Sequence, residues 1–244
     1  MKDGWRQSLA ELVGTFYLCF IGIGAIVTDQ YLRTENPAQP RLGLVGIALA
    51  HGLALSIAVS ATMNISGAHL NPAVTITMLA CRRIGVGKAV CYIIAQCVGA
   101  VLGAALVKTF FTFNAGIWQE AHLGLPMVTK ELASEAMGWR TAVAIEAALT
   151  FLLVFSIFGT AVDPRAPKIG GFGIGLTVAF DILVGGPLTG AAMNPARTLG
   201  PALVGYLFTR DMSYWSMHGV YWAGPIAGGL IAGLIYHHVI LPRE

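Results

Sequence analysis

Charged residues are scarce in this chain. Lys, Arg, Asp and Glu together make up 11% of its 244 residues, whereas hydrophobic residues make up 56%. A typical soluble domain has about a quarter of its residues charged, so the scarcity excludes an ordinary water-exposed surface over most of the chain. The composition indicates a protein that crosses a membrane several times. The small net charge of +3 gives no indication of nucleic-acid binding, and we expect none.

Cysteine is also rare, and no recognised set of catalytic or metal-binding residues is present. The four cysteines, Cys19, Cys81, Cys91 and Cys97, lie in or near the first three apolar runs, so a structural disulfide is not expected. Their spacing does not match a metal site. The chain lacks the Gly-x-Ser-x-Gly and His-Glu-x-x-His motifs of hydrolases. We therefore expect no metal, no cofactor and no enzymatic activity.

Long apolar runs are what the chain does contain. Each run is close to the ~20 residues that a helix needs to cross ~30 Å of hydrocarbon. They predict six membrane spans, at about 8–28, 42–63, 87–108, 139–162, 169–188 and 213–240. The first run is too long for a signal peptide and has no clear cleavage site after it, so we expect it to be retained.

The distribution of basic residues predicts the orientation. Six spans place both termini on one side of the membrane, and Lys and Arg are slightly more frequent on that side. The positive-inside rule therefore predicts that both termini are cytoplasmic. We expect an integral, multi-pass protein, in the plasma membrane rather than in an organelle membrane.

The two halves of the chain resemble each other. The similar pairs of segments are 10–27 with 144–162, 66–79 with 189–203, and 95–107 with 222–234. The repeats extend over approximately 1–112 and 139–244, and an external loop at 113–138 joins them. Because each repeat has three spans, the two enter the membrane from opposite sides, which is an inverted-topology repeat.

The tripeptide Asn-Pro-Ala occurs three times. The copy at 36–38 lies in a polar connector with no apolar run after it, and we assign it no function. Asn71-Pro72-Ala73 and Asn194-Pro195-Ala196 occupy equivalent places in the two repeats. Asn caps a helix and Pro fits its first turn, so each of these copies predicts a helix start. The short apolar stretches that follow, 71–80 and 194–204, predict two half-helices that meet in the middle of the membrane.

The segments SGAHLNPAV and GAAMNPAR, within an inverted repeat of six spans, resemble the aquaporin (major intrinsic protein) family. The resemblance covers essentially the whole chain. It implies an all-α membrane protein of six transmembrane helices and two half-helices, which form a single channel domain over 1–244. It also implies a homotetramer with one pore in each subunit.

The resemblance implies roles for the residues around each motif. The asparagine amides would orient passing water and so break a continuous proton wire. Glu11 and Glu146, at matching places in spans one and four, would brace the two loops from inside the bundle. The ring of His69 would only anchor its loop. Backbone carbonyls would form a ladder of acceptors for water, at Gly67, Ala68, His69, Gly190, Ala191 and Ala192.

Arg197 is the most conspicuous charged residue near the motifs. It lies one helical turn after Asn194, and a charge inside a membrane indicates a functional residue. The first motif has Val74 at the equivalent position, so the charge belongs to one mouth, the extracellular one. By the resemblance, Arg197 forms the selectivity constriction with His51, Ile182 and Ala191. This set departs from the Phe and His of strict water channels and from the Trp of glycerol channels. It resembles that of tonoplast intrinsic proteins and ammonia-permeable aquaporins.

These observations predict a passive channel for water and small neutral solutes, including ammonia and also hydrogen peroxide or urea, that excludes protons and ions. A glycerol or urea facilitator is the alternative within the family, although Thr198 and Ala202 stand where such proteins carry Asp and a basic residue. A secondary transporter is the alternative from another class. The sequence leaves open the role of Asp181. It favours a fixed neutral His51 over one that gates the pore with pH.

Overall fold

The computed structural model describes residues 4–35 and 37–242, and this part of the chain is helical, with no strand. Six helical segments are long and apolar enough to cross a membrane, which confirms the six predicted spans. Four of them are α1 (Gly4–Glu35), α2 (Gly43–Ser66), α4 (Val86–Phe110) and α8 (Phe172–Thr189). In the other two, α7 (Gly138–Ile157) and α10 (Val220–Ile235) continue into the short helices η3 (Phe158–Val162) and η5 (Tyr236–Ile240).

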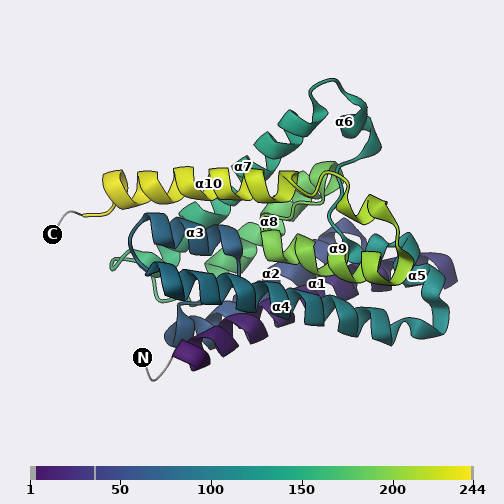
Figure 1. The fold of residues 1–244 in the computed structure, drawn as a ribbon, viewed down its shortest axis with the longest axis horizontal. Helices are drawn as coiled ribbons and strands as arrows, with labels where there is room; N and C mark the ends of the chain where they lie inside the picture. Colours follow the sequence, from purple (N-terminus) through teal and green to yellow (C-terminus); the bar gives the residue numbers. More distant parts are fainter. Residues whose placement is uncertain (1–3, 36, 243–244) are drawn as a thin grey trace.

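The two predicted half-helices are α3 (Pro72–Ala80) and α9 (Pro195–Thr209). In Figure 1 they lie on opposite sides of the centre of the bundle, with α3 toward one end and α9 toward the other. The prediction for α9 was too short. The helix continues past Pro201 to Thr209, and its 15 residues extend over about 22 Å at 1.5 Å a residue.

The helices pack in matching pairs. α1 packs on α4 and α2, and α7 packs on α10 and α8, while each half-helix packs on a long helix of the other repeat, α9 on α4 and α3 on α10. Glycine permits the closest of these contacts. A Cβ at Gly99 would meet the carbonyl of Leu12 in α1, and a Cβ at Gly228 would meet that of Ala147 in α7. Small residues at such positions let two backbones approach.

These contacts correct the alignment of the last pair of repeat segments. Leu12 and Ala147 each directly follow the glutamate of their helix, so Gly99 corresponds to Gly228. The match of 95–107 with 222–234 was therefore out of register by two residues. These helices are rich in glycine and alanine, so few side chains distinguish one alignment register from another. The contacts between helix backbones do distinguish the registers.

The segment predicted as a simple external loop is largely folded. Around 113–138 lie η1 (Thr112–Asn114), α5 (Ala115–Glu120), η2 (His122–Gly124) and α6 (Lys130–Ser134), and η4 (Met212–Trp215) precedes α10. The first turn of α1 and the end of η5 lie at one end of the bundle, and α5 lies at the other (Figure 1). Of the 36–38 tripeptide, Asn36 is outside the described residues.

A short connector after η3 is fixed by charge. The side chain of Arg165 donates hydrogen bonds of 2.9 and 2.6 Å to the carboxylate of Asp163, and these bonds hold the pKa of Asp163 below its usual range. Arg165 also donates to the carbonyl of Ile240, and the hydroxyl of Tyr236 donates to Asp163. The ends of the fourth and sixth spans are thereby joined at the same face of the bundle.

Candidate functional site

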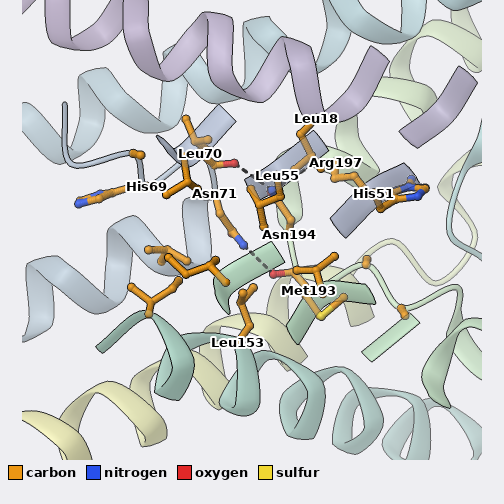
Figure 2. Close-up of a pocket in the computed structure, with 18 of the residues that line it drawn as sticks. Leu18, His51, Leu55, His69, Leu70, Asn71, Leu153, Met193, Asn194 and Arg197 are labelled. Carbon is orange, nitrogen blue, oxygen red and sulfur yellow. Dashed lines mark hydrogen bonds between the residues drawn. The ribbon is translucent and has the colours of Figure 1, made fainter. Parts of the chain in front are cut away.

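The two asparagines begin the half-helices and hold each other's loops. The side-chain oxygen of Asn71 accepts a hydrogen bond from the backbone N–H of Ala73, and that of Asn194 accepts from the N–H of Ala196, so both are N-caps. The amide of Asn71 donates to the carbonyl of Met193 at 2.8 Å, and the amide of Asn194 donates to that of Leu70 at 2.9 Å. Figure 2 shows these crossed bonds at the centre of the site.

Sequence reasoning did not find the crossed bonds. The prediction was that the amide N–H groups face passing water. Each amide has two N–H groups, and one of them donates a hydrogen bond to the opposite loop. One N–H of each asparagine remains for a solute. The amide group is planar, so the hydrogen bond made by the first N–H also fixes the direction of the second N–H.

Glu11 fixes the loop before α3. It lies fully buried in α1, and its carboxylate accepts four hydrogen bonds of 2.6 to 2.9 Å. The donors are the Ser66 hydroxyl, the backbone N–H groups of His69 and Leu70, and the amide of Gln96. A buried carboxylate needs such donors, because burying an unpaired charge is costly.

Glu146 fixes the loop before α9 in the same way. It is fully buried in α7 and accepts from the hydroxyl of Thr189 and from the backbone N–H groups of Ala192 and Met193, at 2.7 to 3.0 Å. Glu146 has no donor that corresponds to the Gln96 amide on Glu11, because Pro225 occupies the equivalent position. The two glutamates thus lie where a bracing role requires, at matching positions in the two repeats.

Tyrosines complete both braces. The hydroxyl of Tyr92 donates to the carbonyl of Ser66, and the hydroxyl of Tyr221 donates to the carbonyl of Thr189, each at 2.8 Å. Both side chains are buried. No sequence motif marks these tyrosines as a pair, and Tyr92 corresponds to Tyr221 only when Gly99 is matched with Gly228.

The bracing bonds determine where the loop carbonyls point. In a trans peptide the C=O of one residue is antiparallel to the N–H of the next, and none of the described peptide bonds is cis. The N–H groups of residues 68–70 and 191–193 are held by Ser66 and Glu11, and by Thr189 and Glu146. The opposed carbonyls therefore point away from the glutamates. They belong to the six residues predicted for the ladder, Gly67, Ala68, His69, Gly190, Ala191 and Ala192.

This backbone shape is strained in both loops. Ala68, Leu70, Ala191 and Met193 have positive φ angles of 44 to 52°, in addition to the glycines at 67 and 190. A non-glycine residue in the left-handed region costs about 1–3 kcal/mol and persists only where its surroundings enforce it. The glutamates supply that enforcement, and such strain is characteristic of functional sites.

A narrow cavity lies between the two loops. Its volume is about 40 Å³, enough for a few water molecules. Both asparagines line it, as do residues 68–70 and 191–193, and Figure 2 places His69 toward one end and His51 toward the other. Its remaining walls are mostly apolar, formed by Leu18, Leu55, Val59, Val74, Leu153, Ile157, Ile174, Val178 and Ile182.

The four residues predicted for the constriction, His51, Ile182, Ala191 and Arg197, all line this cavity, and each is at most 5% exposed. A guanidinium nitrogen of Arg197 lies 3.2 Å from Nε2 of His51, and the other donates to the carbonyl of Gly124 at 2.8 Å. Within the described part of the chain, Arg197 forms no salt bridge, and it lines the cavity.

The contacts of His51 determine its tautomer. Nδ1 lies 2.9 Å from the carbonyl of Ile47, which can only accept, so Nδ1 carries the proton. Arginine can only donate, so Nε2 of His51 is the acceptor in the contact with Arg197. Both nitrogens are therefore used by a neutral ring.

The carbonyl of Gly124 holds the side chain of Arg197, and no sequence motif indicates this contact. Gly124 lies in the segment predicted as an external loop, yet the fold of η2 brings its carbonyl within 2.8 Å of the Arg197 guanidinium. Pro126 lies two residues after Gly124 and packs on Gly190, where a Cβ would overlap the Pro126 backbone. No motif marks this segment, because its role depends on a contact with a residue 73 positions later.

Two further residues were considered in the sequence. Nδ1 of His69 lies 3.1 Å from the hydroxyl of Thr75, the anchor that was expected, but the ring also lines the cavity. Asp181 is 3% exposed, and one of its oxygens has no partner among the described residues. It does not line the cavity between the two loops.

The architecture built from these residues has known counterparts. A family model described as major intrinsic protein matches residues 1–236. The chain belongs to the major intrinsic protein family. Members of this aquaporin family are channels and not enzymes, so the chain is an aquaporin-family channel.

Similar proteins include plant aquaporins. The chain is 42% identical over 247 residues to the probable aquaporin TIP3-2 of Arabidopsis thaliana, with 98% of this chain and 85% of that protein covered. It is 38% identical to the aquaporin TIP4-4 of Zea mays, with 98% and 91% covered. These names confirm the resemblance to tonoplast intrinsic proteins. They do not support the expected plasma membrane, because that class is named for the vacuolar membrane.

The fold is also similar to a solved structure. The X-ray structure of the aquaglyceroporin from Plasmodium falciparum superimposes with a TM-score of 0.83 at 25% identity, and 97% of each chain is covered. This match confirms the predicted fold of six spans and two half-helices in an integral, multi-pass membrane protein.

Proposed function

We propose that this major intrinsic protein conducts water passively through the cavity between Asn71 and Asn194. The observation that carries the proposal is the meeting of two capped helix starts, with their asparagine amides, in the middle of one narrow cavity. The apolar walls offer water few strong contacts, and the loop carbonyls offer acceptors along one side. Such a path binds water weakly enough to let it leave, as conduction requires.

Protons and ions are excluded by electrostatics in this proposal. Each helix start contributes about half a positive charge, and the two starts face the same point. The remaining N–H groups of Asn71 and Asn194 turn the oxygen of a central water toward themselves, which interrupts a proton wire. Arg197 adds a positive charge at one mouth and forms no salt bridge within the described residues.

The constriction supports small neutral solutes besides water. His51 and Arg197 form its polar side, and Ile182 and Ala191 form its apolar side. Ammonia, hydrogen peroxide and urea are small and polar, so contacts with these residues can replace their hydration. Ammonium is repelled by the positive charge of Arg197. We propose ammonia as the first solute to test beside water.

Glycerol facilitation is the second candidate, because the similar solved structure is that of an aquaglyceroporin. A secondary transporter would need ionisable residues that are free to couple to transport. Glu11 and Glu146 are instead engaged by four and three donors in the loop braces, which favours a passive channel.

The assembly and orientation belong to the same proposal. We propose a homotetramer in which each subunit has its own pore, with both termini cytoplasmic and the Arg197 mouth on the opposite side. The unit is one channel domain over 1–244, with the repeats at approximately 1–112 and 139–244. Large apolar side chains on the outer face, including Leu53, Ile57 and Val184, offer area for contact with lipid and with other subunits.

Stopped-flow swelling of vesicles that contain the purified protein tests the proposal. Wild type is expected to accelerate water flux with a low activation energy and no saturation. Ile182→Trp should fill the constriction and lower the flux at least about tenfold, which corresponds to about 1.4 kcal/mol in the barrier. Leu183→Trp is the matched control, because the adjacent side chain is 39% exposed on the outer face of the same helix.

Parallel measurements with ammonia, urea and glycerol rank the solutes. A glycerol flux that exceeds water flux would favour the facilitator, and saturation or dependence on an ion gradient would favour a transporter. The proposal is overturned if wild-type vesicles swell no faster than empty ones, or if Ile182→Trp conducts as well as Leu183→Trp.

A further inference from the structure

The two mouths of the cavity have equivalent positions with different chemistry. Counted from the asparagines, His51 corresponds to Ile174 and Arg197 corresponds to Val74, and all four line the cavity. Counted from the buried glutamates, Gly22 in α1 corresponds to Ile157 in α7. Ile157 lines the cavity, but Gly22 does not. At this mouth a side chain is missing from the long helix.

The ring of His51 occupies the space that this missing side chain leaves. A Cβ built on Gly22 would overlap Nε2 and Cδ2 of His51 and lie 3.0 Å from its Cε1. Since His51 lines the cavity and Gly22 does not, the ring lies between α1 and the cavity. Any atom added at Gly22 therefore pushes the ring away from α1, toward Arg197 and the conducting space.

The His51 ring has little freedom to move around an added Cβ at Gly22. Nδ1 is tied to the carbonyl of Ile47 at 2.9 Å, and Nε2 is tied to Arg197 at 3.2 Å. His51 and Arg197 are each only 4% exposed, and Arg197 is held in turn by Gly124. Close-packed interiors transmit a displacement of this kind to the next side chain instead of absorbing it.

We propose that Gly22 is the positioning residue that sets the free width of the constriction, by letting the His51 ring lie against α1. The inference rests on the proposed function, because it assumes that the cavity conducts. Gly22 touches no solute and acts through His51. The other repeat has Ile157 at the position of Gly22. The glycine therefore leaves the constriction wider than an isoleucine at the same position would.

Water flux per subunit through Gly22→Ala tests this inference. The variant should conduct at least about fivefold less than wild type, with a higher activation energy, because the displaced ring narrows the file. Gly24→Ala is the matched control on the same helix, since a Cβ there meets only Val107, at an ordinary 3.7 Å. It should conduct like wild type.

A second variant separates positioning from a general structural defect. The double variant carries Gly22→Ala and His51→Ala, so it lacks the imidazole ring that the new Cβ would displace. Its water flux should therefore equal that of His51→Ala alone, within about twofold. Such non-additivity is expected only of residues that act through each other. If Gly22→Ala does not fold, the double variant is expected to fold, because the overlap is gone.

The inference alone is overturned if wild type conducts and folded Gly22→Ala conducts equally well. It is likewise overturned if the alanine lowers flux as much without the His51 ring as with it, or if the double variant also fails to fold. A wild-type protein that does not conduct would instead overturn the proposed function, and this inference with it.

Discussion

At the residue scale, the constriction depends on two side chains that hold each other in place. His51 uses one ring nitrogen as a donor and the other as an acceptor. Arg197 divides its guanidinium between His51 and the carbonyl of Gly124. Partners of this kind keep a buried polar group in a single orientation, because breaking one contact leaves an unsatisfied group. The constriction is therefore preorganised.

The neutral, doubly bonded His51 predicts that the pore does not respond to pH through this ring. Protonating Nε2 would break its contact with Arg197 and set two positive groups side by side. We expect water flux in vesicles to stay constant from about pH 5 to about pH 8, the range in which an unperturbed histidine changes charge. His51→Ala should show the same flat profile at its own level of flux. A step in wild type that disappears in His51→Ala would contradict this prediction.

At the element scale, each half-helix is set in place by a loop that is held from behind. A buried glutamate and the hydroxyl of the residue directly before the glycine bind successive N–H groups, so the strained loop cannot turn its carbonyls back. The asparagine at the end of each loop then caps its own helix and donates to the other loop. Neither half is complete without the other.

Contact between the long helices supports this arrangement and is sensitive to added volume. Gly228→Val should force α10 away from α7, because the new side chain meets the backbone of Ala147, which cannot move aside. Overpacking of this kind typically costs about 1–3 kcal/mol. The melting temperature in detergent should therefore fall by several degrees, measured with a thiol-reactive dye that reports exposure of the buried Cys19 and Cys81.

Gly87→Val is the control for this prediction. Gly87 is also helical, in α4, but a Cβ there meets nothing within 4 Å. The variant carries the same change in helix propensity without the contact. Equal melting temperatures for Gly228→Val and Gly87→Val would show that the close approach of α7 and α10 does not limit stability.

At the scale of the whole molecule, the arrangement is symmetric in position and asymmetric in chemistry. Every constriction residue has a repeat partner in the same cavity, but the partners of His51 and Arg197 are Ile174 and Val74. One mouth is therefore polar and charged, and the other is mostly apolar. The orientation of the chain decides which side of the membrane each mouth faces.

Labelling of single cysteines measures that orientation. In a Cys91→Ser background, which removes the exposed native cysteine, Ser134→Cys and Lys168→Cys place thiols at exposed positions of α6 and of the α7–α8 connector. With both termini cytoplasmic, a membrane-impermeant maleimide added outside intact cells should label Ser134→Cys and not Lys168→Cys. Lysed cells should show labelling of both. The opposite pattern in intact cells would reverse the proposed topology.

Features that contiguous residues encode could be predicted before the structure was known. Apolar runs of sufficient length gave the six spans, because a helix must bury its length in hydrocarbon to cross it. Asn followed by Pro marked both half-helix starts, because cap and first-turn chemistry are local. The paired Asn-Pro-Ala segments and the glutamates at matching positions of α1 and α7 then pointed to the family.

Contacts between segments that are distant in the chain could not be predicted in this way. The crossed bonds of Asn71 and Asn194, the Gly124 carbonyl on Arg197 and the space at Gly22 each join residues from separate elements. The end of α9 at Thr209 and the register of Tyr92 with Tyr221 were likewise not readable in sequence. Such features arise from packing in three dimensions, and neither hydrophobic period nor cap chemistry specifies which side chain meets which backbone.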